Sequence, residues 1–187
     1  MMRKRRIVIK PRFWVILACL MLIGVCLWAN SQMTEKTAKP IKCEATEVDT
    51  SAPAVEEREY ILNIPLSCEL QVELYEATQE FGVDYHIMIA LIDRESKFQN
   101  VIGDSGASYG YCQIQPKWWY GLMTEIGATD LTIPKDNFRT ACAIVSKLMK
   151  NYGSIEGALV AYNQGHYYGY STQYSRDVMA NAERYRA

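Results

Sequence analysis

Histidine is scarce in this sequence, and cysteine pairs of the C-x-x-C type do not occur. The 187 residues include two histidines and six cysteines. Zinc sites in proteins are built from His and Cys at short, regular spacings. Because neither the number of histidines nor the spacing of the cysteines fits such a site, we expect no metal and no cofactor.

An excess of positive charge is also missing from most of the chain. Residues 1–12 carry six Lys and Arg and no acids, whereas the remainder carries 14 Lys and Arg against 21 Asp and Glu. Proteins that bind nucleic acids present basic surfaces to the phosphates. The mildly acidic remainder gives no reason to expect a nucleic acid partner. Binding to a polymer would depend on a shaped groove rather than on charge.

Alternating apolar and polar runs of strand length are absent, and apolar residues recur at helical spacing instead. The fold class is therefore expected to be mainly or wholly α. The expected helices run from Leu66 to Phe81, Asp84 to Ser96, Pro116 to Met123, Asp136 to Met149, Ile155 to Asn163 and Tyr174 to Tyr185. The expected N-caps are Ser67, Asp84, Asp136 and Ser154. Residues 99–112, rich in Gly, Ser and Asp, are expected to be irregular.

The one long apolar run lies near the N-terminus, at residues 13–29. A helix of this length reaches roughly 26 Å, close to the hydrocarbon thickness of a bilayer. The basic residues at 1–12 predict that the N-terminus stays in the cytoplasm. We expect a single-pass membrane anchor, or a signal peptide if the segment is cleaved. The rest of the chain then lies outside the cytoplasm, at the cell membrane or secreted.

Two segments follow the apolar run. Residues 30–59 are polar and contain few large apolar side chains, which favours a flexible linker. Residues 60–187 contain the six expected helices and are long enough for one core. Disulfides can form in an extracytoplasmic compartment, but the apolar surroundings of Cys112 and Cys142 favour buried free thiols there. Pairing among these two, Cys43 and Cys68 is left open.

Glu95 lies at the end of the apolar stretch from Ile87 to Ser96. A carboxyl group beside apolar surface has a raised pKa, because its charged form is poorly solvated. Such a group keeps its proton near neutral pH and can donate it to a leaving oxygen. A Glu at a helix end is more often exposed or salt-bridged, here to Arg94 or Lys97, so position alone does not identify an acid.

Four short motifs in residues 60–187 resemble those of lytic transglycosylases of the SLT type. In chain order they are Ala90 to Phe98 around Glu95-Ser96, Gly106 to Pro116 with Gln113-Ile114, Ala161 to Gly165, and Tyr174 followed by Val178. Their shared order carries the resemblance, since no single motif is decisive. The chain departs from the family pattern at Tyr111-Cys112, where Leu-Met is usual, and at Gln164, where Ala is usual.

The resemblance implies a single catalytic domain with a goose-lysozyme-like α fold, similar to glycoside hydrolase family 23, that acts on peptidoglycan glycan strands. It implies that Glu95 is the only acid/base. In this family the Glu protonates the bond between N-acetylmuramic acid and N-acetylglucosamine, then accepts a proton from the muramyl 6-hydroxyl, which leaves a 1,6-anhydro end. The resemblance maps substrate-binding roles onto Ser105 or Ser108, Gln113, Tyr162, Asn163 and Tyr174. Packing or backbone hydrogen bonding is the alternative role for the amides and tyrosines.

Two other functions stay open. A goose-type muramidase uses water and needs a second carboxylate. Among Asp84, Asp93 and Asp104, only Asp104 lies on the loop after Glu95, where it could approach a cleft, and its other interpretation is turn formation. The second alternative is a non-catalytic wall-binding protein on the same fold.

The last loop of the domain is rich in tyrosine. Tyr167, Tyr168 and Tyr170 are candidate groove residues, because aromatic faces stack on sugar rings. An anchored wall-cleaving enzyme is also compatible with a partner in the cell-envelope machinery, which the sequence does not specify.

Overall fold

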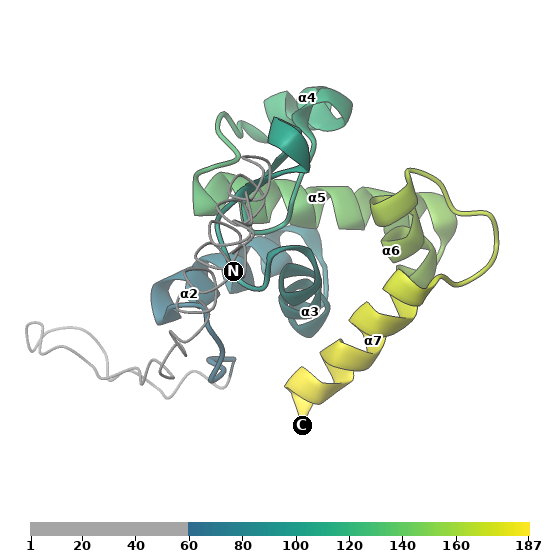
Figure 1. Cartoon of the computed structure of the whole chain (residues 1–187), viewed down its shortest axis with the longest axis horizontal. Coiled ribbons are helices and arrows are strands. Elements are labelled where there is room, and N and C mark those ends of the chain that lie inside the picture. Colours follow the sequence, from purple (N-terminus) through teal and green to yellow (C-terminus); the bar gives the residue numbers. More distant parts are fainter. Residues whose placement is uncertain (1–59) are drawn as a thin grey trace, which may run out of the picture. The chain divides into compact units, whose positions relative to one another are not determined.

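Helices dominate residues 60–187, the part of the chain that the computed structural model describes, and the predicted α class is confirmed there (Figure 1). The helices are α2 (Cys68–Phe81), α3 (Tyr85–Ser96), α4 (Pro116–Ile126), α5 (Pro134–Tyr152), α6 (Ile155–Gln164) and α7 (Gln173–Arg186). Within residues 60–187, no helix is both long and apolar enough to cross a membrane. The segments predicted at 1–12, 13–29 and 30–59 lie outside the described residues, so the anchor and the linker stay predictions.

Helix α3 is the apolar centre of the described residues. Every residue from Ile87 to Ile92 is buried, which is the pattern of a helix surrounded by protein on all sides. The helix begins where the Asp84 carboxylate accepts a hydrogen bond from the Ile87 N–H at 3.0 Å. It ends at Ser96, and the next residue, Lys97, adopts a left-handed conformation with φ of 53°. The predicted cap and the predicted end are both confirmed.

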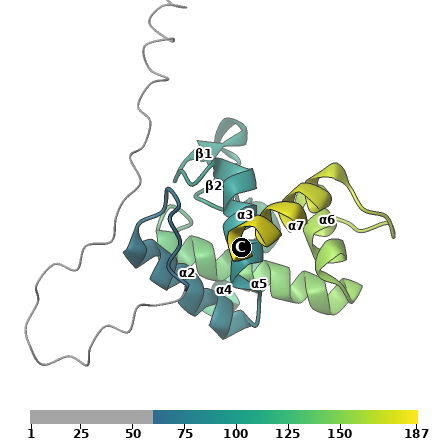
Figure 2. The same cartoon turned by 90° about the horizontal axis from the view of Figure 1, so that it is seen from below.

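The other helices pack around this centre in two groups. Helix α5 packs against α2, α4 and α6, and α7 packs against α3 and α6. Figure 1 shows α5 running across the domain, with α6 beside its C-terminal end. In Figure 2 the C-terminal end of α7 lies next to α3. The C-terminal helix is therefore positioned to bring its side chains onto α3.

Local capping chemistry places most helix ends where they were predicted. Ser67 and Ser154 cap α2 and α6 through their side-chain oxygens. The predicted cap at Asp136 is wrong, because α5 begins two residues earlier, at Pro134. Proline is well suited to the first helical position, since its fixed φ is helical and it has no N–H to leave unsatisfied. The Asp136 carboxylate instead accepts hydrogen bonds from the preceding turn, from the Thr129 N–H at 2.7 Å among others.

The segment between α3 and α4, predicted to be irregular, contains a small hairpin. Strands β1 (Ile102–Gly103) and β2 (Ser108–Tyr109) pair antiparallel around a 3-10 turn, η1 (Asp104–Gly106). The buried Asn137 of α5 holds the following loop, because its side chain accepts from the Cys112 N–H at 2.9 Å and donates to the Tyr109 carbonyl at 2.9 Å. Short strands with no apolar alternation give little sequence signal, which explains why the hairpin was not expected.

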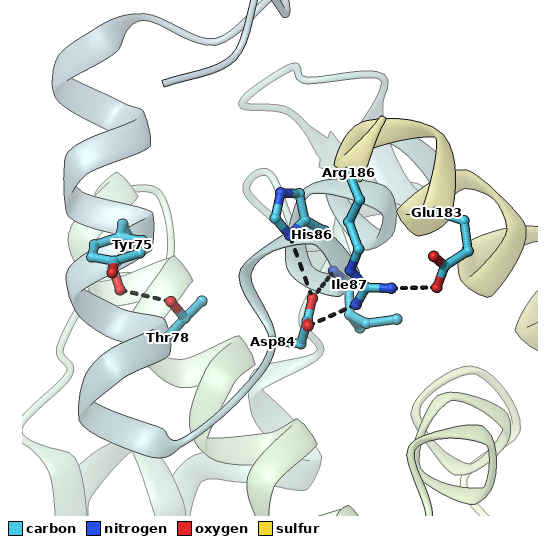
Figure 3. A network of polar contacts seen from close by, with 7 residues as sticks. All are labelled: Tyr75, Thr78, Asp84, His86, Ile87, Glu183 and Arg186. Carbon is cyan, nitrogen blue, oxygen red and sulfur yellow. Dashed lines mark hydrogen bonds and ion pairs between the residues drawn. The ribbon is translucent and has the colours of Figure 1, made fainter. Parts of the chain in front are cut away.

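Polar contacts fasten the C-terminal end of α7 to the start of α3 (Figure 3). The Arg186 guanidinium donates to the Asp84 carboxylate at 2.7 Å and also pairs with Glu183. His86 lies 3.9 Å from the same Asp84 carboxylate. Burial opposes the charge of Asp84, but the Ile87 N–H and Arg186 together lower the pKa of this carboxyl group. One carboxylate therefore caps α3 and also holds α7.

The cysteines of the described residues fall into two kinds. Cys112 and Cys142 are buried free thiols, as predicted. Cys68 is disulfide-bonded. Burial raises the pKa of both free thiols, so neither is a reactive thiolate near neutral pH.

Candidate active site

A cleft of about 800 Å³ opens beside the C-terminal end of α3. The hairpin, α4 and α6 supply much of its remaining wall. Among the residues that line it are Glu95, Asp104, Ser108, Gln113, Tyr162 and Asn163. The structure thus brings together residues from all of the first three motifs of the resemblance.

Glu95 is half-buried at the edge of this cleft, one residue before the end of α3. The Tyr174 hydroxyl of α7 donates a hydrogen bond to its Oε1 at 2.5 Å. Arg94 does not form an ion pair with Glu95, and its guanidinium instead lies 5.8 Å from the centre of the Tyr174 ring. Within residues 60–187 no cation contacts Glu95, so the exposed or salt-bridged alternative does not describe it.

Burial is the largest influence on Glu95 and raises the pKa of its carboxyl group. The hydrogen bond from Tyr174 and the positive charge of Arg94 act in the opposite direction, but burial outweighs them. Burial and the adjacent Glu95 also raise the pKa of Tyr174, so the phenol keeps its proton and stays a donor. Glu95 is therefore a carboxylic acid able to hold a proton at a higher pH than an exposed Glu.

Asp104 shares the cleft with Glu95 and is the centre of a small polar cluster. Its φ is 48°, and its carboxylate accepts a hydrogen bond from the buried Ser108 hydroxyl. The Gln115 amide lies 3.4 Å from the same carboxylate oxygen. The negative charge of Asp104 also contributes to the raised pKa of Glu95. Asp84 and Asp93, the other two carboxylates considered, do not line the cleft.

Gln113 and Tyr162 line the cleft but direct their polar atoms to the backbone. The Gln113 amide donates to the carbonyls of Gly110 at 2.8 Å and Val101 at 3.0 Å. A Cβ at Gly103 would lie 2.1 Å from the Gln113 amide oxygen, so any larger residue there would displace this amide. The Tyr162 hydroxyl donates to the Cys112 carbonyl at 2.7 Å. Both side chains therefore hold the walls of the cleft in place.

The remaining predicted site residues differ in position. Asn163, near the end of α6, is exposed on the cleft wall, and its amide makes no hydrogen bond within the described residues. Of the two serines, Ser108 lines the cleft, whereas Ser105 is exposed on the 3-10 turn and does not. The free amide of Asn163 is thus the most available hydrogen-bonding group among them.

Sequence reasoning missed some of the cleft wall. Trp118, Trp119, Gln115 and His166 line the cleft, whereas Tyr167, Tyr168 and Tyr170 do not. Tyr167 packs over Gly157, with its ring 3.0 Å from the position of a Cβ there. The Trp118-Trp119 pair follows Gln113-Ile114 closely, but helical periodicity alone does not show that it faces a cleft. Among residues 60–187, no group of three or more His, Cys, Asp or Glu is placed to hold a metal ion.

Comparison with known proteins supports the fold described above. The family described as Transglycosylase SLT domain matches residues 74–178, more than half of the chain. The solved structure of an inactive mutant of the lytic transglycosylase Slt from Pseudomonas aeruginosa is similar, with a TM-score of 0.53 and 19% identity. The match covers 62% of this chain and 23% of the Slt chain. The similarity in fold therefore concerns one part of that longer protein. No curated protein matches the chain.

Proposed function

The chain belongs to the transglycosylase SLT domain family, whose members are lytic transglycosylases that act on peptidoglycan, and we propose that it cleaves the β-1,4 bond between N-acetylmuramic acid and N-acetylglucosamine with Glu95 as its single acid/base. The observation that carries the proposal is the state of Glu95. Its carboxyl group faces a cleft, has a pKa raised by burial and accepts a hydrogen bond from Tyr174.

The proposed reaction moves one proton out and one proton back. Glu95 gives its proton to the glycosidic oxygen, and the bond from this oxygen to C1 of the muramyl residue breaks. The muramyl 6-hydroxyl oxygen then bonds to C1, and its proton passes to the Glu95 carboxylate. The products are an N-acetylglucosamine hydroxyl and a 1,6-anhydromuramyl end, and no water is consumed.

One carboxylate is enough for this chemistry because the nucleophile belongs to the substrate. Hydrolytic glycosidases require a second carboxylate to activate water or to form a covalent intermediate. An intramolecular hydroxyl is already close to the reacting carbon. This proximity avoids much of the entropic cost of positioning a separate water molecule. Tyr174 keeps its donor proton, and so it orients Glu95 in both protonation states.

The other predicted site residues differ in how directly they would contact the substrate. Asn163 binds the substrate directly, since its amide is free and faces the cleft. Ser108, Gln113 and Tyr162 contribute surface to the binding site while their polar atoms hold the hairpin and its loop. Ser105 reaches substrate only if the glycan extends past the 3-10 turn.

The hydrolytic alternative has one observation in its favour. Asp104 lines the same cleft as Glu95, where a second carboxylate could act on water. Against it, the Asp104 carboxylate is engaged by Ser108 and lies near the Gln115 amide, so its oxygens already serve the hairpin. The balance favours a hairpin role for Asp104 and the non-hydrolytic reaction.

Mass spectrometry of digested peptidoglycan tests the proposal. The full-length chain should release muropeptides that lack one water relative to hydrolytic products, and the Glu95→Gln variant should release none. Asp104→Asn should change the amount of product but not its anhydro structure. Ordinary reducing ends would establish the muramidase instead. A folded chain that binds peptidoglycan but releases nothing would favour the non-catalytic alternative.

We further propose that the catalytic domain lies outside the cytoplasm. The apolar run at 13–29 and the basic residues before it support a membrane anchor with this orientation. The disulfide at Cys68 also fits an oxidising compartment. Protease added to intact protoplasts should degrade the domain if it is displayed, whereas protection until lysis would contradict the orientation.

A further inference from the structure

Trp118 is unusually exposed for a tryptophan. It lies on α4, and 70% of its surface is accessible although it lines the cleft. Ligand clefts are lined mainly by apolar and aromatic side chains, so an exposed aromatic ring on a cleft wall is a candidate binding residue. The four-motif resemblance does not extend to Trp118, because its second motif ends at Pro116, and so it does not explain this exposure.

The Trp118 ring is held in place despite its exposure. Its indole N–H donates to the Gln115 amide oxygen at 3.2 Å. The Gln115 amide nitrogen in turn lies 3.3 Å from the Ser108 hydroxyl, deep in the cleft wall. The Lys117 ammonium lies 4.6 Å from the centre of the ring. A side chain fixed in this way loses little conformational entropy when a ligand binds.

The hydrogen bond to Gln115 also limits what the ring can offer. The only polar atom of the indole is already used and Lys117 lies over the ring, so the exposed remainder of the ring offers apolar surface to a ligand. The apolar C–H face of a pyranose ring is a good partner for an aromatic face. The geometry selects a sugar ring that stacks, rather than a group that forms hydrogen bonds.

We propose that Trp118 is a sugar-stacking subsite that binds one N-acetylhexosamine ring of a β-1,4-linked glycan, with Gln115 as the residue that positions the indole. The inference rests on the proposed function, since it assumes that a glycan strand occupies this cleft. It adds a residue that sets substrate affinity at the α4 side of the cleft.

Tyr120 provides a matched control on the same helix. Its side chain is 73% exposed, as much as that of Trp118, but it does not line the cleft. Exposure on α4 is thus the same in both, and only the position relative to the cleft differs. An effect of Trp118 that Tyr120 does not share would come from the cleft.

The test measures binding of a soluble β-1,4-linked hexamer of N-acetylglucosamine to the full-length Glu95→Gln chain, so that turnover does not interfere. Trp118→Ala should weaken binding about tenfold or more. Trp118→Phe should recover most of the affinity, and Tyr120→Ala should leave it unchanged. Circular dichroism of each variant establishes that it is folded.

Three outcomes would overturn the subsite. They are unchanged binding in Trp118→Ala, an equal loss in Tyr120→Ala, or no binding of the hexamer by the Glu95→Gln chain. Digestion of peptidoglycan by the unmodified chain separates this inference from the proposed function. Activity without a Trp118 effect rejects the subsite alone, whereas a Trp118 effect on binding without any activity rejects the proposed reaction alone.

Discussion

Two tyrosines of α7 each donate a hydrogen bond to a carboxylate of α3, and the two pairs differ in their surroundings. Tyr174 reaches Glu95 at 2.5 Å, and Tyr185 reaches Asp93 at 3.1 Å. Asp93 also forms an ion pair with Lys97 at 3.0 Å and does not line the cleft. Glu95 has no such cation and faces the cleft.

The comparison separates the role of the hydrogen bond from the role of the environment. The Tyr174 hydroxyl favours the charged form of the Glu95 carboxylate. At Asp93 the carboxylate also has an ammonium partner, Lys97. At Glu95 burial outweighs the hydrogen bond and raises the pKa. The same contact between the same helices therefore supports a structural carboxylate in one place and a candidate acid in the other.

The largest expected difference in activity is between two variants that each remove one of these carboxylates. Glu95→Gln should lower the rate of muropeptide release by roughly 10²- to 10⁴-fold, because the proton donor is lost. Asp93→Asn should keep the rate within about twofold, since an ion pair with the exposed Lys97 ammonium contributes little to stability and Asp93 lies outside the cleft. Similar losses in both variants would mean that the α3–α7 contact, not the acid, limits activity.

Removing each hydroxyl should shift the pH dependence of only one variant. Tyr174 donates to Glu95 and lowers its pKa, so Tyr174→Phe should raise that pKa further. The proposed reaction needs protonated Glu95, so activity should fall as pH rises through this pKa. We expect the alkaline limb of the rate profile to move to higher pH, with a maximal rate about tenfold lower because Glu95 is less well oriented.

Tyr185→Phe is the control for the hydroxyl experiment, since it removes an equivalent contact from the same helix. Its alkaline limb should stay where it is in the unmodified chain. A limb that moves to lower pH in Tyr174→Phe, or that moves equally in both variants, would contradict the assignment of Glu95 as the acid.

Neutralising Glu95 should also stabilise the fold. Because folding raises the pKa of Glu95, the cost of its charge is absent below the pKa of the unfolded Glu, about 4.3. The cost grows as pH rises through the folded pKa. Glu95→Gln should therefore raise the free energy of unfolding at pH 8 by about 1 kcal/mol. The gain, measured as a higher Tm, should vanish near pH 4. An equal gain from Asp93→Asn would remove the contrast between the pairs.

The sequence predicted the helices well because their ends are set by local contacts. Asp84 caps α3 through a residue three positions away, and Gly153 ends α5 in a left-handed conformation. Such signals lie within one turn of the chain. The mistaken cap at Asp136 shows the limit of this reasoning, since proline and aspartate competed for the same helix start and the carboxylate served the preceding turn.

The cleft was harder to predict because contacts between distant residues form it. Glu95 and Tyr174 are 79 positions apart, and only the resemblance assigned both to one site. The position of Asp104 depends on left-handed backbone at Asp104 and Ser105, which non-glycine residues seldom adopt. Trp118 was not predicted as a cleft residue because periodicity reports which residues share a helix face, not whether that face meets the core or a cleft.

The smallest expected effect concerns the third contact between α7 and α3, the ion pair of Arg186 and Asp84. The side chains are 35% and 44% exposed, so solvent screens the pair and Arg186→Ala should cost less than about 1 kcal/mol. Folding lowers the pKa of Asp84, so its contribution is present above the unfolded value of about 3.9 and is lost as pH falls through the folded pKa. The difference in Tm should therefore be seen at pH 7 and fade in strong acid, while muropeptide release stays unchanged. A large loss of activity in this variant would mean that Tyr174 reaches Glu95 only when the far end of α7 is held, and the two tyrosine pairs would then be coupled rather than independent.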